Sequence, residues 1–234
     1  MAKDGRIWLS HSGISVLNRC PRCFWLQYRK KIRQPEGIKS RLANRFDEIL
    51  KSYFNIFRER NILPPMVSAE LEGKLESPFQ EKYFVRINEK YGFWGKLDEC
   101  LVNTDKKHIP VDFKTASSDP RSREILDVYK DQINAYLFLI SQSNKKTGNC
   151  GYLMYVYPKD GEKLHEGFPM VIYLKKIEGD PKKAKKKIEK AIEVLEKEMP
   201  KPSPTCDFCT WFKTITIELG TKNSSSDYGQ LTFA

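Results

Sequence analysis

Three side chains that can act as acids, bases or metal ligands lie close together in the sequence. Asp98 occurs in the segment GKLDE, and Asp112 and Lys114 occur two positions apart in VDFKT. Side chains at positions i and i+2 leave the same face of a strand, and a hairpin can bring Asp98 beside them. Carboxylates that bind Mg²⁺ or Mn²⁺ activate water, and a lysine orients that water or a phosphate oxygen. The spacing is compatible with metal-dependent phosphodiester hydrolysis, although D-x-K alone is more typical of ordinary charges at strand ends.

Four of the six cysteines form two C-x-x-C pairs near opposite ends of the chain. They are Cys20, Cys23, Cys206 and Cys209. Four thiolates are the ligand set of a structural metal site, and both Zn²⁺ and an iron–sulfur cluster accept it. Metal binding would join the two ends of the domain and contribute folding free energy. Four unligated thiols are the alternative.

The pattern of apolar residues predicts the elements that must position these side chains. Helical spacing occurs over residues 14–32, 40–60, 122–141 and 181–199, and strand-like segments occur over 81–88, 91–103, 107–115, 150–158 and 168–177. Ser10 or Ser12 is available to cap the first helix. The three central strands are expected to be antiparallel, with Asp98 and Asp112 on adjacent strands.

These elements predict an α/β fold with a mixed sheet, in the order helix, three strands, helix, strand. We expect one domain over residues 1–219, with its core at 24–205. The cysteine-bearing segments 9–33 and 200–213 would be joined as a metal clamp. Residues 220–234 are rich in Ser and Gly and are expected to form a mobile tail.

The charge of the chain favours a polyanionic partner. There are 41 Lys and Arg against 30 Asp and Glu, a formal net charge of +11, and cations gain affinity for nucleic acid by releasing its counterions. A merely basic surface is the alternative. The basic residues that we expect to contact nucleic acid are Arg19, Arg22, Lys30, Lys182, Lys183 and Lys186. No segment has the length of a signal peptide or membrane span, so a cytoplasmic location without membrane contact is expected.

Three segments together resemble a known family. GKLDE, IPVDFKT and then QINAY in the following helix are similar to the RecB-like branch of the PD-(D/E)XK nuclease superfamily. The segment LSHSGISVLNRCPRCFWLQY resembles the opening of iron–sulfur members, which include CRISPR-associated exonucleases. The resemblance covers roughly residues 9–212 and implies a restriction-endonuclease-like core.

The resemblance implies a role for each matching residue. The implied catalytic set is Asp98, Asp112, Lys114, Gln132 and Tyr136. The two aspartates and the backbone carbonyl of Phe113 would bind the metal ion, and Lys114 would orient water and phosphate. Gln132 and Tyr136 are four residues apart, so both can face one site from a helix; Tyr136 as plain core is the alternative.

Two departures from the family pattern leave questions open. The family often has a histidine or glutamate ligand in its first helix, whereas this chain has no histidine between His11 and His108. Asp47 is the nearest substitute, with Glu48 as its competitor and an exposed helix charge as the alternative reading. Family members divide their cluster cysteines as one and three, whereas here the division is two and two. A 4Fe–4S cluster is expected from the resemblance, with Zn²⁺ as the alternative.

The function expected from these patterns is a Mg²⁺- or Mn²⁺-dependent deoxyribonuclease. An exonuclease acting on single strands or DNA ends in repair, recombination or defence, with a helicase or other nucleic-acid-processing protein as its partner, fits the resemblance best. The first rival is a catalytically weak, nuclease-derived DNA-binding module of a larger complex. The second is a zinc-dependent RNA-binding protein, in which the carboxylates would be irrelevant.

Overall fold

The computed structural model describes residues 5–35, 37, 40–161 and 167–218, so the tail expected at 220–234 lies outside the described residues. The described chain divides into two compact units. The core unit comprises residues 1–14 and 36–192, and the cysteine unit comprises residues 15–35 and 193–234. Within the part of the chain that the structure describes, every helix is too short or too polar to span a bilayer.

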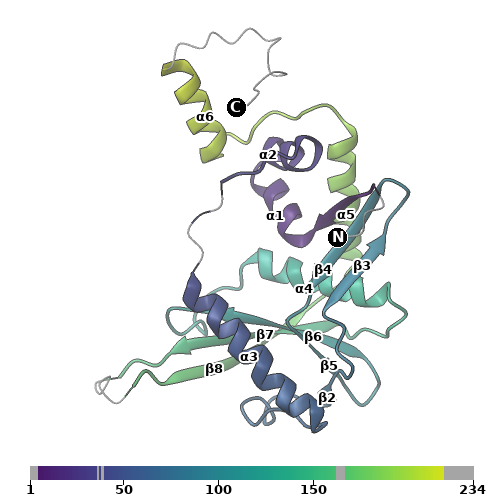
Figure 1. The fold of residues 1–234 in the computed structure, drawn as a ribbon, viewed down its shortest axis with the longest axis vertical. Helices are drawn as coiled ribbons and strands as arrows, with labels where there is room; N and C mark the ends of the chain where they lie inside the picture. Colours follow the sequence, from purple (N-terminus) through teal and green to yellow (C-terminus); the bar gives the residue numbers. More distant parts are fainter. Residues whose placement is uncertain (1–4, 36, 38–39, 162–166, 219–234) are drawn as a thin grey trace. The chain divides into compact units, whose positions relative to one another are not determined.

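The core unit contains a mixed five-stranded sheet (Figure 1). Its strand order is β2-β5-β6-β7-β8, formed by Lys74–Leu75, Glu99–Val102, His108–Thr115, Cys150–Pro158 and Met170–Glu178. Strands β6 and β7 are parallel, and the other neighbours are antiparallel. A parallel neighbour requires a crossover, which the helix α4, Asp127–Ser141, provides. This confirms the expected mixed α/β architecture.

A second sheet of three strands adjoins it in the core unit. Its order is β1-β4-β3, formed by Ile7–Ser10, Tyr91–Lys96 and Lys82–Arg86. Strand β1 runs parallel to β4, while β3 and β4 form an antiparallel hairpin. Residues of α4 pack under this sheet, as in the contact between the rings of Phe93 and Phe138, whose centroids are 6.0 Å apart. Helix α4 thus contacts both sheets.

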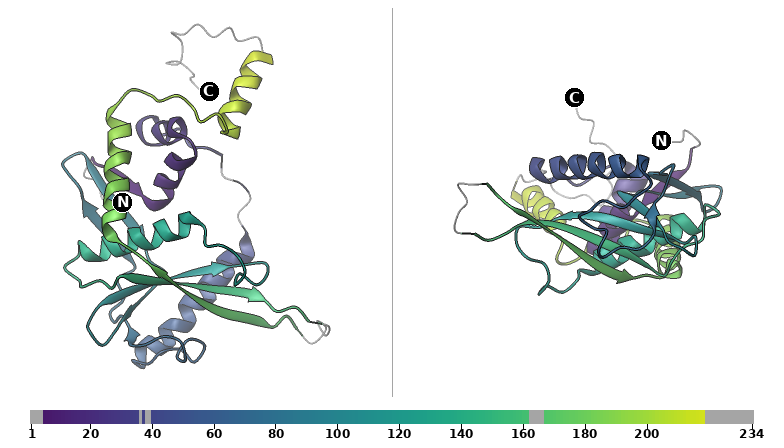
Figure 2. Two further views of the ribbon diagram at one scale, coloured as in Figure 1. Left: turned by 180° about the vertical axis from the view of Figure 1, so that it is seen from behind. Right: turned by 90° about the horizontal axis from the view of Figure 1, so that it is seen from below.

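Helix α3, Arg41–Glu59, covers one face of the five-stranded sheet (Figure 2). Its apolar side, including Leu50 and Phe54, packs on β6 residues such as Val111 and Phe113. Ser40 caps its first turn by accepting a hydrogen bond from the backbone N–H of Ala43. Because side chains alternate along a strand, Asp112 and Lys114 point away from this core. They point toward α4 instead.

The structure corrects two of the predicted elements. The sequence predicts one strand over residues 91–103, whereas the structure has β4 and β5, which belong to different sheets. The chain changes sheets at Leu97 and Asp98, and Leu97 is anchored there with 0% exposure. The sequence also predicts one helix over 14–32, but Cys20 is extended and Pro21 starts a new helix, because proline cannot donate the hydrogen bond that a continuous helix needs.

The cysteine unit is mainly helical. It contains most of α1 (His11–Arg19), α2 (Pro21–Trp25), the π-helical turn η1 (Leu26–Lys30), the end of α5 (Pro181–Glu196) and α6 (Asp207–Glu218). Ser10 caps α1 by accepting a hydrogen bond from the N–H of Gly13. The side chains of Arg22 and Trp25 donate to the carbonyls of Pro200 and Lys197, at 3.2 and 3.0 Å. These bonds fasten the N-terminal helices to the C-terminal segment.

Candidate active site and four-cysteine site

Asp112 and Lys114 lie on β6 and face α4. Asp112 is 1% exposed, and Lys114 Nζ forms an ion pair with its Oδ2 atom. Lys114 Nζ also lies 4.9 Å from the centre of the Tyr129 ring, at the start of α4. The two-residue spacing on a strand thus brings acid and amine together, as the sequence predicts.

Gln132 of α4 connects the polar side chains of this site. Its Nε2 atom donates to Asp112 Oδ1 at 2.7 Å and to the Tyr136 hydroxyl at 2.8 Å. Its Oε1 atom accepts a hydrogen bond from Lys114 Nζ at 3.0 Å. The Tyr136 hydroxyl donates to Asp112 Oδ1 at 3.1 Å. One amide therefore fixes the orientation of the acid, the amine and the phenol.

Asp98 lies in the junction between β4 and β5 and is held against β6. Its Oδ2 atom accepts a hydrogen bond from the backbone N–H of Phe113 at 3.0 Å. Its Oδ1 atom forms an ion pair with Lys51 of α3 at 2.9 Å. Lys51 also pairs with Asp47 Oδ2 at 2.8 Å, so one amine links the two aspartates. Glu48 pairs with Arg45 on the exposed side of the helix instead.

Burial dominates the electrostatics of the site. It raises the pKa of Asp112 to about 6; Lys114 opposes this rise and the carboxylate of Asp98 adds to it. Burial also raises the pKa of Tyr136 well above its usual range, so the phenol stays protonated and can donate. Burial alone would lower the pKa of Lys51, but the ion pairs with Asp47 and Asp98 outweigh it and raise that pKa.

The donor atoms suit a hard divalent cation. Asp112 Oδ2 is buried and is contacted by the ammonium group of Lys114, and the second lone pair of this oxygen is left for a ligand bond. Mg²⁺ typically takes one or two carboxylates and completes its shell with water. Asp98 and Asp112 offer two carboxylates. Among the described residues the four cysteines are the only group of three or more side chains placed to hold a metal ion, so Asp47 does not join Asp98 and Asp112 in such a group.

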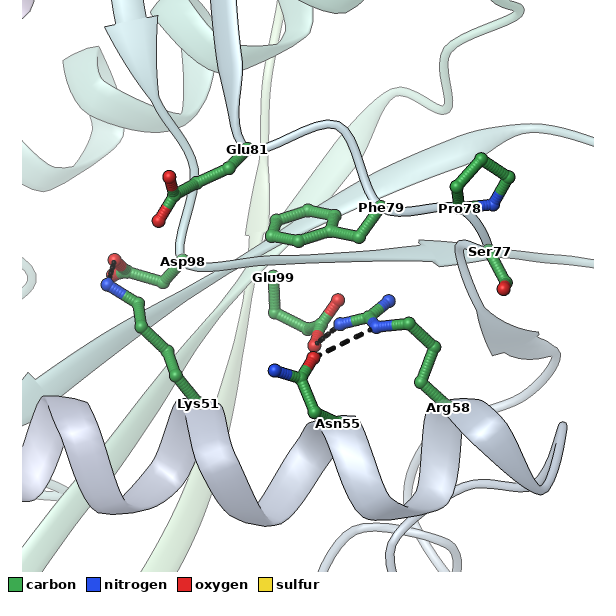
Figure 3. A pocket seen from close by; sticks show the side chains of 9 residues that line it. All are labelled: Lys51, Asn55, Arg58, Ser77, Pro78, Phe79, Glu81, Asp98 and Glu99. Carbon is green, nitrogen blue, oxygen red and sulfur yellow. Dashed lines mark hydrogen bonds and ion pairs between the residues drawn. The ribbon is translucent and has the colours of Figure 1, made fainter.

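A hollow of about 500 Å³ opens beside Asp98 (Figure 3). Lys51, Asn55 and Arg58 line it from α3, and Phe79 and Glu81 line it from the segment before β3. The guanidinium of Arg58 lies over the Phe79 ring, 4.7 Å from its centre. The hollow thus combines an aromatic ring, polar groups and cations next to a candidate catalytic carboxylate.

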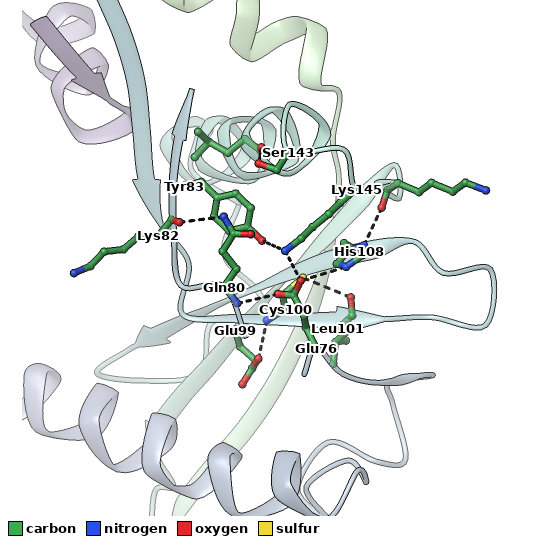
Figure 4. A network of polar contacts seen from close by, with 12 residues as sticks. Glu76, Gln80, Lys82, Tyr83, Glu99, Cys100, Leu101, His108, Ser143 and Lys145 are labelled. Carbon is green, nitrogen blue, oxygen red and sulfur yellow. Dashed lines mark hydrogen bonds and ion pairs between the residues drawn. The ribbon is translucent and has the colours of Figure 1, made fainter. Parts of the chain in front are cut away.

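A buried polar network anchors the strand that follows Asp98 (Figure 4). Glu76 accepts a hydrogen bond from Lys145 Nζ at 2.6 Å and faces His108 Nε2 at 3.2 Å. Lys145 also donates to the Tyr83 hydroxyl at 3.0 Å. Because Glu76, Tyr83 and His108 belong to different strands or their flanks, the network cross-links both sheets.

Glu99 directly follows Asp98 and is itself held in place by a buried ion pair. Its Oε2 atom lies 2.5 Å from Arg58 Nη2, and its Oε1 atom accepts a hydrogen bond from the backbone N–H of Cys100 at 2.8 Å. Burial raises the pKa of Glu99, and Arg58 opposes that rise. These contacts leave little freedom to the backbone that carries Asp98.

Comparison with known proteins gives this arrangement a family. A family model described as the PD-(D/E)XK nuclease superfamily matches residues 42–213, well over half of the chain. The chain belongs to this superfamily of nucleases. Among curated proteins, the comparison found none that matches the chain.

Two solved structures have a similar outline to this PD-(D/E)XK nuclease. An alkaline exonuclease (LHK-Exo) from Laribacter hongkongensis is 11% identical, with 93% of this chain and 96% of that chain covered and a TM-score of 0.48. A phage-related exonuclease from Haemophilus somnus 129PT is 13% identical, with 85% and 82% covered and a TM-score of 0.42. These values are too low to transfer any residue's role.

Sequence reasoning missed two residues near the nuclease site. Lys51 follows Asp47 by four positions on α3, so helical spacing could have found it. His11 follows β1 and hydrogen-bonds the backbone of Val128; it also interacts electrostatically with Asp131 and Lys114. Burial lowers the pKa of His11 to about 4. Nothing in the local sequence around His11 indicates this location.

The basic residues predicted to contact nucleic acid fall into both units. Arg19, Arg22 and Lys30 belong to the cysteine unit, and Arg22 is engaged with the Pro200 carbonyl. Lys182, Lys183 and Lys186 are exposed on α5 in the core unit. Their role in binding stays a prediction.

The four cysteines of the two C-x-x-C pairs do come together, as the sequence predicts. The ligand atoms of Cys20, Cys23, Cys206 and Cys209 all lie within 4.8 Å of one another. Sulfur–sulfur distances are 3.8 Å for Cys20 and Cys209, 3.7 Å for Cys23 and Cys206, and 3.6 Å for Cys23 and Cys209. This is the geometry of a metal-binding group.

The surroundings favour the thiolate form of one cysteine. Burial opposes ionisation of Cys20, but hydrogen bonds from the backbone of Cys23 and Ser203 outweigh it and lower its pKa to about 7. Burial raises the pKa of Cys23 to about 11 when no metal ion is bound. A bound cation would offset this cost, because metal coordination deprotonates thiols.

Proposed function

We propose that this nuclease hydrolyses phosphodiester bonds in DNA with the help of Mg²⁺ or Mn²⁺, and that it acts as an exonuclease on single strands or ends. The observation that carries the proposal is the hydrogen-bonded set of Asp112, Lys114, Gln132 and Tyr136, with Asp98 bonded to the backbone N–H next to Asp112. Family membership adds the reaction class.

Each residue has a role that its contacts support. Lys114 presents an ammonium group that can hold the attacking water or a phosphate oxygen. Gln132 keeps Lys114 and Asp112 at a fixed separation, and Tyr136 donates to Asp112 without ionising. The hollow beside Asp98 offers room for a nucleotide next to the scissile bond.

Asp98 and Asp112 are the residues that would hold the divalent cation, with the carbonyl of Phe113 and the carboxylate of Asp47 as candidates for further ligands. A bound cation lowers the pKa of water and offsets the negative charge that develops on the phosphate. Lys51 now neutralises Asp47 and Asp98. It must move aside if both are to become ligands.

The test is cleavage of end-labelled single-stranded and double-stranded DNA with Mg²⁺ or Mn²⁺. Asp112→Ala and Lys114→Ala should each lower the rate by about 100-fold or more, because both remove a group acting at the reacting atoms. Asp105→Ala and Lys130→Ala are matched controls on exposed ion pairs and should cleave like the wild type. Release of mononucleotides from one labelled end would identify an exonuclease and its polarity.

The result that would refute the assignment is wild-type activity in both Asp112→Ala and Lys114→Ala. Circular dichroism and a melting curve must accompany each variant, so that lost activity is not mistaken for lost fold. Work in repair, recombination or defence, with a helicase supplying strands, is the setting in which such an activity would be used.

A second candidate function is a DNA-binding module with weak catalysis. One observation favours it: Lys51 occupies the space between Asp47 and Asp98, where a cation would compete with it. Calorimetric titration with Mn²⁺ separates the two functions. If no ion binds to the wild type while DNA affinity is high, the binding module is the better description.

For the four cysteines we propose one tetrahedral Zn²⁺ ion. A tetrahedron with a zinc–sulfur distance of about 2.3 Å has sulfur–sulfur edges of about 3.8 Å, which agrees with three of the distances, at 3.6–3.8 Å; all four sulfurs lie within 4.8 Å of one another. In a 4Fe–4S cluster each thiolate binds a different iron atom, so the sulfurs stand farther apart. The spacing therefore supports Zn²⁺ over the cluster that the family resemblance implies.

Anaerobic purification followed by metal analysis tests this assignment. One zinc per chain and no visible absorption are expected, and Cys206→Ser should lower both the zinc content and the melting temperature. Cys150→Ser is the matched control outside the group. A brown protein with about four irons per chain would overturn the zinc assignment in favour of a cluster.

A further inference from the structure

Three aromatic rings gather on the outer face of the three-stranded sheet. Strand alternation turns Leu9 and Phe93 inward, where both are buried. It turns Trp8 of β1, Trp94 of β4 and Phe84 of β3 outward, and Phe84 is 46% exposed. We call this outer surface, made of Trp8, Phe84, Trp94 and Gly92, the aromatic face.

The rings form a continuous surface. Phe84 stacks on Trp94, with centroids 5.9 Å apart and planes 11° apart, and meets Trp8 edge-on at 5.4 Å. Trp8 lies across Gly92, where a Cβ atom would come within 2.5 Å of its ring. Only glycine at position 92 leaves this space. The ring of Trp8 therefore packs directly against the backbone of the sheet at Gly92.

Positive charges surround these rings. Lys82 and Arg86 leave the same face of β3 as Phe84 and are exposed, and Lys96 stands opposite Lys82 on β4. Lys96 is paired with Glu81 at 2.9 Å, in an ion pair open to solvent. Arg6, which precedes β1, donates to the Asn88 carbonyl. Cations outnumber anions on this surface, as they do in the whole chain.

The strands of the aromatic face lead to the candidate active site. Strands β1 and β4 are parallel, so both carboxyl ends lie at one edge of the sheet (Figure 1). His11 follows β1 and lies near Lys114, and Asp98 comes two residues after the end of β4. A strand that follows the sheet in this direction arrives at Asp98.

We propose that the aromatic face binds single-stranded DNA and guides it to the active site. The unpaired bases stack on Trp8, Phe84 and Trp94, and Lys82 and Arg86 face the phosphates, as in other single-strand binding surfaces that combine aromatic rings with cations. In a duplex the faces of the bases are covered by the neighbouring base pairs, so they cannot stack on these rings. The inference rests on the proposed function, because it takes DNA as the substrate. The surrounding cations favour a polyanion over an apolar protein partner.

Binding is measured first without cleavage. In buffer without Mg²⁺ or Mn²⁺, fluorescence anisotropy compares a labelled oligothymidylate with an abasic oligonucleotide of the same length. The wild type should prefer the oligothymidylate. Phe84→Ala and Trp94→Ala should each weaken that binding by about 5-fold or more, the usual cost of one lost base–aromatic stack, and leave abasic binding unchanged. Phe168→Ala, which removes an aromatic ring that is 71% exposed on the β7–β8 connection, is the matched control.

The charges are tested through the salt dependence. A Lys82→Ala, Arg86→Ala double variant should lower the slope of log affinity against log salt by about 1.4, since each phosphate contact contributes about 0.7 for single strands. Melting curves check the fold of every variant. Phe84→Ala should destabilise the fold least of the aromatic variants, because that ring is about half exposed.

The outcomes separate this inference from the proposed function. Equal binding of both oligonucleotides by the wild type, or unchanged binding by Phe84→Ala and Trp94→Ala, overturns the aromatic face as a DNA site even if the protein cleaves DNA. Base-dependent binding that these variants lose supports it. If such binding occurs but no cleavage follows with Mg²⁺ or Mn²⁺, the proposed nuclease activity fails while the binding site stands.

Discussion

Gln132 offers the sharpest test of the active-site geometry, because it hydrogen-bonds Asp112, Lys114 and Tyr136. Its amide donates to Asp112 and accepts from Lys114, but it makes no covalent change in the proposed reaction. Gln132→Met keeps the length and helix propensity of the side chain and removes its hydrogen bonds. Asp112 and Lys114 then lose the hydrogen bonds to Gln132 that position them.

The size of the effect follows from these contacts. Hydrogen bonds to charged groups are worth about 1.5–3 kcal/mol each, and Gln132 makes two of them, at 2.7 and 3.0 Å. Asp112 and Lys114 keep their mutual ion pair, so we expect only part of this sum to be lost, about 1.5–3 kcal/mol. That corresponds to a rate about 10- to 100-fold lower.

The assay is single-stranded DNA cleavage with Mg²⁺ across a range of substrate concentrations. If Gln132 positions the reacting groups, kcat should fall while KM changes by less than about 3-fold, because substrate binding is not its task. Gln142→Met, at the exposed end of the same helix, is the control and should match the wild type. A melting curve reports any loss of fold.

A kcat for Gln132→Met within about 3-fold of the wild type would refute this reasoning, since 1.5 kcal/mol corresponds to more than tenfold. A rise in KM with unchanged kcat would also contradict it and would make Gln132 a substrate-binding residue.

Three further predictions concern stability. Burial depresses the pKa of His11 to about 4, so the neutral imidazole makes its full contribution above pH 6.5, and the free energy of unfolding falls by about 3 kcal/mol as the pH drops from 6.5 toward 4. Urea unfolding against pH should show this slope, and His11→Asn should flatten it. Gly92→Ala should lower the free energy of unfolding by about 1–3 kcal/mol, seen as a lower urea midpoint, because the added Cβ would collide with the Trp8 ring. Arg58→Met should cost about 3–5 kcal/mol by leaving Glu99, which is 1% exposed, without its cation, and adding Glu99→Leu should recover much of the melting temperature.

The parts of the site that the sequence predicts are those set by local geometry. Asp112 and Lys114 share a strand face by their two-residue spacing, and Gln132 and Tyr136 share a helix face by their four-residue spacing. Both relations hold in any strand or helix. The pairing of these two elements in turn follows from the family resemblance.

The parts that the sequence misses depend on contacts between distant segments. Strand β1 has only four residues and forms because Ile7–Ser10 pairs with Tyr91–Trp94, far along the chain. Asp98 lies at a change of sheet, which no periodic pattern marks. For the cysteines, spacing predicts their grouping, whereas the sulfur–sulfur distances on which we base the proposal of a single ion come only from the structure.

The positions of the four cysteines in the sequence set the order in which parts of the new chain can assemble. Cys20 and Cys23 leave the ribosome before Cys206 and Cys209, which follow about 180 residues later. At roughly 5–20 residues per second, the first pair waits on the order of 10 to 40 s for the second. All strands of both sheets have emerged by then, so the nuclease core can fold before the thiols meet. The four-cysteine group is thus completed only after both sheets have been synthesised.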